Sequence, residues 1–241
     1  MSRLVLLSGW GIDARIWRPL EAHWPAGLEV TTPDWPGYGA RPSLDDPADL
    51  AALAAAMAGD LPANAVWVGW SLGGLLAAAL LDHLPAPRAL VQLGMGPRFC
   101  AEGGIPPREL AAFRRAFARD GEATRQHFLR WQLQGEPAPR AAHRRLLDLI
   151  GRGPGGEAAT LAVGLEQLTT LDVSARLNAP PCPVRRTAGE RDPLLAPALR
   201  QSADHRLAGA GHCPMVSRPD ALAACLARIV RQPAPTEERP S

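Results

Sequence analysis

The sequence predicts an α/β fold in which a mostly parallel central sheet is joined by crossover helices and carries an inserted helical segment. Over the first hundred residues or so, short apolar segments alternate with helical ones, which is the pattern of a parallel sheet. Residues 97–171 are helical in pattern and contain no convincing strand. Strand-like sequence then resumes at Pro183, so the insertion divides the sheet into two parts of the chain.

The expected strands are short runs of aliphatic and β-branched residues that end at glycine, proline or serine. They lie at 3–7, 28–31, 65–70, 89–93, 183–188 and 205–207. Asp46 is the expected N-cap of a helix in which Leu50, Leu53 and Met57 recur at helical spacing. Further helices are expected at 72–84, 194–202 and 219–230.

These elements predict one domain with an insertion. We expect residues 1–96 and 172–231 to form the sheet core and residues 97–171 to form a helical lid. Residues 232–241 are polar and rich in proline, which predicts a flexible tail.

Composition excludes several classes of protein. The 241-residue chain has a formal net charge of +2 and 46% hydrophobic residues, which argues against a polyanion-binding or disordered protein. Its four cysteines show neither CxxC pairing nor metal-ligand spacing, so we expect reduced thiols and no metal site. Neither a cleavable signal nor a run of about 18 apolar residues is present. We therefore expect a cytoplasmic monomer without nucleic-acid or membrane partners.

A candidate nucleophile lies between an expected strand and an expected helix. Residues 69–73 read GWSLG and match the G-x-S-x-G pattern around Ser71. A serine on so tight a turn needs glycine at the flanking positions, because a Cβ atom there would collide with neighbouring chain. The alternative is a chance match in a chain rich in glycine and alanine.

A serine hydroxyl needs a base, usually a histidine that is oriented by a carboxylate. Of six histidines, His212 lies in a loop before the last expected helix, and we expect it to be the base. Asp192 follows the strand at 183–188 and is the expected acid; Glu190, Asp172 and Asp204 are its competitors. Alternatively, Asp192 is a turn or N-cap residue before a proline.

A tetrahedral intermediate formed on a serine also needs N–H donors for its oxyanion. The N–H of Leu72, directly after the candidate nucleophile, is one expected donor. The N–H of Trp10, in the glycine loop after the first strand, is the other. The Trp10 indole is expected to line an acyl pocket, to be a core aromatic, or to be both, since the two roles are compatible.

Four segments together resemble the α/β-hydrolase superfamily. They are GWG at 9–11, DWPGYG at 34–39, GWSLGG at 69–74 and GAGHCP at 209–214. The likeness covers nearly the whole chain outside the expected lid and tail. Within the superfamily, GWG together with GWSLGG is similar to the biotin-pathway esterases, which remove the methyl group from a pimeloyl-carrier-protein methyl ester.

The resemblance implies a capped, cytoplasmic α/β-hydrolase without metal or cofactor, in which Ser71, Asp192 and His212 form the catalytic triad. Two departures concern the start of the chain. Ser8 stands where the superfamily often has histidine, and the usual opening β-hairpin is missing or shortened. A short-chain carboxylesterase, a carbon–carbon bond hydrolase and a non-catalytic ligand-binding protein of the same fold are alternatives.

The expected lid is the basic part of the chain. Residues 98–152 contain eleven arginines and six acidic residues, a local net charge of +5. Such a surface can steer an acidic acyl carrier protein to the active-site mouth, and the pairs Arg114, Arg115 and Arg144, Arg145 are the candidate docking residues. The alternative is a solvated helical face, since every basic residue of the chain is arginine.

Overall fold

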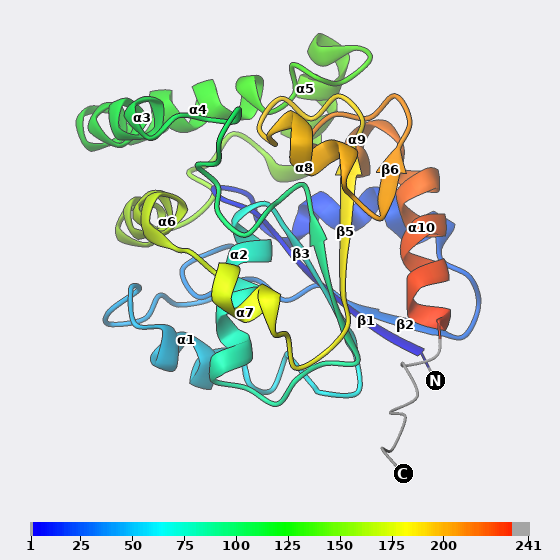
Figure 1. The fold of residues 1–241 in the computed structure, drawn as a ribbon. Helices are drawn as coiled ribbons and strands as arrows, with labels where there is room; N and C mark the ends of the chain where they lie inside the picture. The colour runs from blue at the N-terminus through cyan, green and yellow to red at the C-terminus, as the bar shows by residue number, and fades with distance from the viewer. Residues whose placement is uncertain (1, 233–241) are drawn as a thin grey trace.

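The computed structural model describes residues 2–232 and contains a six-stranded sheet whose neighbouring strands all run parallel (Figure 1). The strands are β1 (Ser2–Leu7), β2 (Leu28–Thr31), β3 (Val66–Trp70), β4 (Ala89–Leu93), β5 (Val184–Gly189) and β6 (His205–Leu207). Their order across the sheet is β2-β1-β3-β4-β5-β6. The predicted fold class is therefore confirmed.

Side chains of successive strand residues enter two separate apolar clusters, one on each face of the sheet. In β1, Val5 and Leu7 belong to one cluster, and Leu4 and Leu6 to the other. All five residues of β3 are buried. This explains why the strands read as continuous apolar runs: both faces of a parallel sheet are covered by helices.

The helices divide between the two faces of the sheet. On one face lie α1 (Leu50–Met57) and α2 (Leu72–Ala79), whose leucines enter the first cluster. On the other face lie the 3-10 helix η1 (Ala14–His23) and α10 (Pro219–Arg231). Figure 1 shows α1 and α2 on the opposite side of the sheet from α10.

Between β4 and the second part of the sheet, residues 97–171 contain four helices and no strand. The helices are α3 (Pro107–Arg119), α4 (Gly121–Trp131), α5 (Pro139–Ile150) and α6 (Ala158–Thr170). Figure 1 shows α3, α4 and α5 in a row above the carboxyl ends of the strands, with α6 below α3. We call residues 97–171 the helical insertion.

Several smaller elements differ from expectation. The N-cap of α1 is Asp49, not Asp46: the Asp49 carboxylate accepts hydrogen bonds from the N–H groups of Ala51 and Ala52. Asp46 instead accepts from the N–H of Ala48 and closes a turn before the helix. The helix η1 and two short helices, α7 (Ser174–Asn178) and α9 (Pro214–Ser217), were not predicted from the sequence.

The remaining elements are the short 3-10 helix η2 (Leu80–Asp82) after α2 and the helix α8 (Pro197–Gln201) after β5. The expected tail at 232–241 lies outside the described residues except for Gln232. Within residues 2–232, no helix combines the length and the apolar character that crossing a bilayer requires.

Replacing the cap of α1 should destabilise the protein more than replacing the aspartate first expected there. Asp49→Ala leaves two helix N–H groups without their side-chain acceptor and should lower the free energy of unfolding by about 1 kcal/mol. Asp46→Ala removes one turn hydrogen bond and should cost less. Urea denaturation of both variants measures the difference, and an equal or larger cost for Asp46→Ala would contradict the assignment of the cap.

Candidate active site

Ser71 lies on a sharp turn between β3 and α2. Its backbone has φ 54° and ψ −127°, and it is the one non-glycine residue with positive φ in the part of the chain that the structure describes. Positive φ is costly for a residue with a Cβ atom and is characteristic of functional sites. The turn is held by hydrogen bonds from the N–H of Ser71 to the Leu93 carbonyl, 2.9 Å, and from the N–H of Gly74 to the Ser71 carbonyl, 2.8 Å.

Glycine is required on both sides of this turn because backbone atoms approach too closely for a side chain. A Cβ atom at Gly69 would lie 2.4 Å from the carbonyl oxygen of Gly73. A Cβ atom at Gly73 would lie 2.4 Å from the carbonyl oxygen of Ser8. Both glycines have negative φ, so space and not backbone conformation selects them.

Asp192 and His212 form a buried pair at the carboxyl edge of the sheet. Their side chains are 0% and 1% exposed, and Oδ2 of Asp192 lies 2.8 Å from Nδ1 of His212. The other oxygen, Oδ1, accepts a hydrogen bond of 2.8 Å from the N–H of Leu194. Asp192 therefore closes a turn with one oxygen and contacts His212 with the other, so its place in a turn does not prevent it from orienting the histidine.

The residue before Ser71 holds the loop that carries His212. The indole N–H of Trp70 donates to the His212 carbonyl at 2.8 Å, and the two rings lie 5.4 Å apart. When Nδ1 carries the proton and donates it to Asp192, Nε2 keeps a free lone pair. Nε2 is buried and has no hydrogen-bond partner within residues 2–232, so the structure joins His212 to Asp192 but not to Ser71.

The acids that competed with Asp192 are engaged elsewhere. Glu190 accepts a hydrogen bond from the N–H of Gly209 at 3.0 Å. Asp204 accepts from the N–H of Arg186, and Asp172 from the N–H of Ser174. Asp172 therefore stabilises a local turn, whereas Glu190 and Asp204 each join the region of β5 to the region of β6.

The two expected oxyanion donors belong to two turns, the one that carries Ser71 and the one that follows β1. Leu72 is the first residue of α2, where an N–H has no carbonyl acceptor within the helix. Trp10 lies in the turn after β1, and its neighbour Gly9 packs on the nucleophile turn: a Cβ atom at Gly9 would lie 3.0 Å from Cβ of Ser71. The two turns are thus in direct contact.

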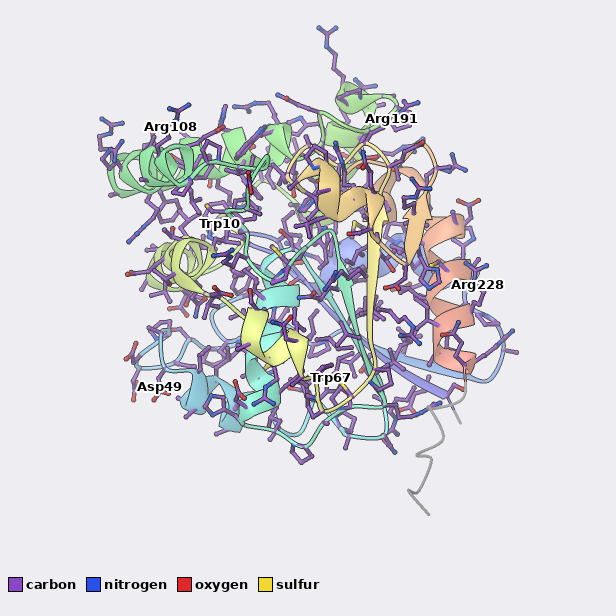
Figure 2. The ribbon with its side chains drawn as sticks, in the orientation of Figure 1. Trp10, Asp49, Trp67, Arg108, Arg191 and Arg228 are labelled. Atoms are coloured by element: carbon purple, nitrogen blue, oxygen red, sulfur yellow. The ribbon has the colours of Figure 1, made fainter. Side chains whose placement is uncertain are left out.

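The indole of Trp10 is a core aromatic that connects the sheet domain to the helical insertion. It is 1% exposed and donates its N–H to the carbonyl of Leu161 in α6 at 2.7 Å. Its ring meets three phenylalanines of the insertion edge-on, with centroids 5.1 to 6.0 Å away: Phe113, Phe117 and Phe128. Figure 2 labels Trp10 beside α6 and below α3.

Two charged residues of the insertion, Arg125 and Glu136, are buried, which was not predicted from the sequence. Arg125, on α4, is 1% exposed and donates to the carbonyls of Gly11 and Gly153 at 2.8 and 2.6 Å. Burial lowers the pKa of its guanidinium. Glu136 is 4% exposed and accepts hydrogen bonds from the loop that carries His212. Residue type alone did not distinguish them from the exposed charges around them.

Cys213 does not offer a second nucleophile. Burial, reinforced by the negative charges of Glu136 and Asp192, raises the pKa of its thiol well above the usual value, so the thiol remains protonated at neutral pH. Within the described residues, no group of three or more histidine, cysteine, aspartate or glutamate side chains is arranged to hold a metal ion.

The four candidate docking arginines lie on two separate helices. Arg114 and Arg115 are on α3, and Arg144 and Arg145 are on α5; Figure 1 shows these helices at opposite ends of the row. Arg114 is half-buried and pairs with Glu166 at 3.4 Å, whereas the other three side chains are exposed.

Comparisons with known proteins identify a family and two similar esterases. Residues 4–225 match the alpha/beta hydrolase family. The chain is 34% identical over 229 residues to the pimeloyl-[acyl-carrier protein] methyl ester esterase of Photorhabdus laumondii, covering 90% of this chain and 87% of the relative. The esterase of the same name from Sodalis glossinidius is 34% identical over 228 residues, with 90% and 88% covered.

Solved structures of low sequence identity share the fold. An esterase from Exiguobacterium antarcticum superposes with a TM-score of 0.78 at 16% identity, covering 96% of this chain and 92% of that structure. A thermophilic esterase from Thermogutta terrifontis superposes with a TM-score of 0.76 at 21% identity, with 96% and 90% covered.

Backbone strain at position 71 should appear as a difference in the free energy of unfolding between two variants. Ser71→Gly removes the Cβ atom that makes positive φ unfavourable, whereas Ser71→Ala retains it. We expect Ser71→Gly to be more stable than Ser71→Ala by about 1 kcal/mol, although glycine loses more chain entropy on folding. Urea denaturation compares the two variants, and a glycine variant of equal or lower stability would argue against a strained turn.

Proposed function

The chain belongs to the alpha/beta hydrolase family, and from this membership we propose that it is a serine carboxylic ester hydrolase with Ser71, His212 and Asp192 as its triad. The observation that carries this proposal is the buried Asp192–His212 pair beside a serine of positive φ. A non-catalytic ligand-binding protein would not need a fully buried acid that orients the nitrogen of a histidine.

In the proposed reaction, Oγ of Ser71 attacks the ester carbonyl and gives its proton to Nε2 of His212. The absence of a partner for this buried nitrogen within residues 2–232 supports the role, because its lone pair is free to accept the serine proton. The hydrogen bond between Ser71 and His212 forms as substrate binds, since such bonds are often open in unliganded enzymes. Asp192 stabilises the imidazolium that results.

The negative charge that develops on the carbonyl oxygen is stabilised by the N–H groups of Leu72 and Trp10. Both are backbone donors, and the contact between Gly9 and Ser71 holds their turns together. The imidazolium then protonates the leaving alcohol, and the acyl group stays on Ser71 as an ester. Water, deprotonated by His212, attacks this ester and releases the carboxylic acid and the free serine.

We further propose that the helical insertion acts as a lid over the triad. Ser71 is 2% exposed and His212 is 1% exposed, so a substrate cannot reach Oγ in this arrangement. The side chains of Trp10 and Leu72 both lie against α6: a Cβ atom at Gly164 would be 2.8 Å from Trp10 and 3.1 Å from Leu72. Substrate entry therefore requires helices of the insertion to move.

For the substrate, we propose a methyl ester of a pimeloyl group carried on acyl carrier protein. The identity of 34% to esterases named for that substrate, over about 90% of the chain, supports this choice. A general short-chain carboxylesterase is the second candidate, because the triad itself does not select the acyl group.

The charge of the insertion supports a carrier-bound substrate. Eight of its arginines are exposed and form no ion pair within residues 2–232: 108, 115, 119, 130, 140, 144, 145 and 152. Figure 2 shows Arg108 at the outer surface of α3. An exposed basic surface next to the active site raises the association rate of an acidic carrier protein.

Removal of the nucleophile should abolish catalysis without unfolding the protein. Ser71→Ala should lower kcat for any ester at least about 10⁴-fold, since alanine cannot form the acyl-enzyme. A fluorophosphonate probe, which reacts with activated serines, should label the wild-type chain and not the variant. The circular dichroism spectra of the two proteins should be the same. A wild-type chain that resists the probe would favour a non-catalytic protein.

Charge reversal on the insertion should separate the two substrate classes. Replacing Arg144 and Arg145 with Glu should lower kcat/KM for pimeloyl-carrier-protein methyl ester by roughly 10-fold or more at low salt, and much less for methyl butyrate. Arg228→Glu on α10, which lies away from the insertion in Figure 2, is the matched control and should behave like wild type. Equal effects on both esters would favour a general carboxylesterase.

A further inference from the structure

We propose that Glu136, on the turn between α4 and α5, positions His212 by holding the backbone on both sides of it, an inference that rests on the proposed esterase function. Oε2 accepts a hydrogen bond of 3.0 Å from the N–H of Gly211. Oε1 accepts one of 2.8 Å from the N–H of Cys213. One side chain of the insertion thus binds the two residues that flank the base.

The turn that carries Glu136 is wedged between the loop of the acid and the loop of the base. A Cβ atom at Gly135 would lie 1.9 Å from the carbonyl oxygen of Arg191, the residue before Asp192. A Cβ atom at Gly211 would lie 2.8 Å from the carbonyl carbon of Gly135. Glycine is therefore needed on both sides of the contact. The turn contacts Arg191 and Gly211, the residues directly before Asp192 and His212.

The chemistry of the contact requires a carboxylate. Two N–H donors converge on one side chain, and a carboxylate accepts with both oxygens, whereas a glutamine would turn its NH₂ group toward one of the donors. Glu136 is 4% exposed and has no ion-pair partner in the described part of the chain. Burying such a charge is costly, and its hydrogen bonds to the His212 loop offset that cost.

The position of His212 therefore has three supports that come from different parts of the chain. Asp192 fixes the ring through Nδ1, Trp70 fixes the residue's carbonyl, and Glu136 fixes the amides on either side. Only Glu136 belongs to the insertion. Movement of the α4–α5 turn would release the base, so the opening that admits substrate must leave this turn in place.

The test compares Glu136→Gln and Glu136→Ala with the matched control Glu102→Gln, which removes an exposed carboxylate of the same insertion. Two readouts are used: kcat and KM for p-nitrophenyl butyrate, and the downfield proton NMR signal of His212 Nδ1–H, which is assigned by its loss in His212→Ala. The proton signal does not depend on turnover.

We expect Glu136→Ala to lower kcat roughly 10- to 100-fold with KM nearly unchanged, because a small displacement of the base affects the chemical step more than binding. Glu136→Gln should retain one hydrogen bond and give an intermediate kcat. The Nδ1–H signal should broaden or shift in both variants and remain in Glu102→Gln.

A Glu136→Ala variant that retains the wild-type kcat and an unchanged Nδ1–H signal would overturn the proposal, as would an equal fall in kcat for Glu102→Gln. Wild-type protein that hydrolyses no ester would refute the proposed function instead. In that case the proton signal alone decides whether Glu136 positions His212, so the two failures are distinguishable.

Discussion

The hydrogen bond between Asp192 and His212 imposes a constraint that the surrounding loops must satisfy. Both side chains are almost fully buried, so a carboxylate in this place is stable only while each of its oxygens has a donor. One donor is local, the N–H of Leu194, and the other is a histidine that comes from a separate loop. The loop after β5 and the loop after β6 must therefore meet, and the hydrogen bond from the Arg191 N–H to the Ala210 carbonyl joins them.

The helical insertion contributes hydrogen bonds to loops of the sheet domain. Arg125 and Glu136 are a buried cation and a buried anion that bind backbone groups and not each other. Arg125 donates to Gly11, beside the candidate oxyanion donor Trp10, and Glu136 accepts from both sides of His212. Apolar contacts with the sheet would be sufficient for an insertion whose one role was to cover the site. Charge-assisted hydrogen bonds to two loops of the sheet domain instead couple the position of α4 to the geometry of the site.

Features of the fold and the site could be predicted from the sequence where they depend on residues close together in the chain, and not where they depend on distant ones. The turn at Ser71 was predictable because its glycines are required by close contacts within the motif itself and with the loop after β1. The cap of α1 was predicted wrongly, since Asp46 and Asp49 both precede the apolar run and only the reach of the side chain separates them. Burial of Arg125 and Glu136 depends on segments more than 70 residues away in the chain, and η1 contains a proline that obscures its periodicity. The catalytic roles of the triad stay a prediction.

Whether the insertion is a docking surface depends on which of its arginines are exposed, and not on how many arginines it contains. In a chain without lysine, a count of arginines cannot separate a docking surface from ordinary composition. The charges of Arg125 and Glu136, both buried, cancel in the sum. Arg98 and Arg114 form ion pairs with acidic residues outside residues 98–152, namely Asp172 and Glu166. The charge that remains is therefore carried by exposed, unpaired side chains. Seven of the eight exposed arginines lie on α3, α4 and α5, and Arg152 follows α5. In the proposed lid role, the segment that covers the triad would also present the surface that a carrier protein meets first.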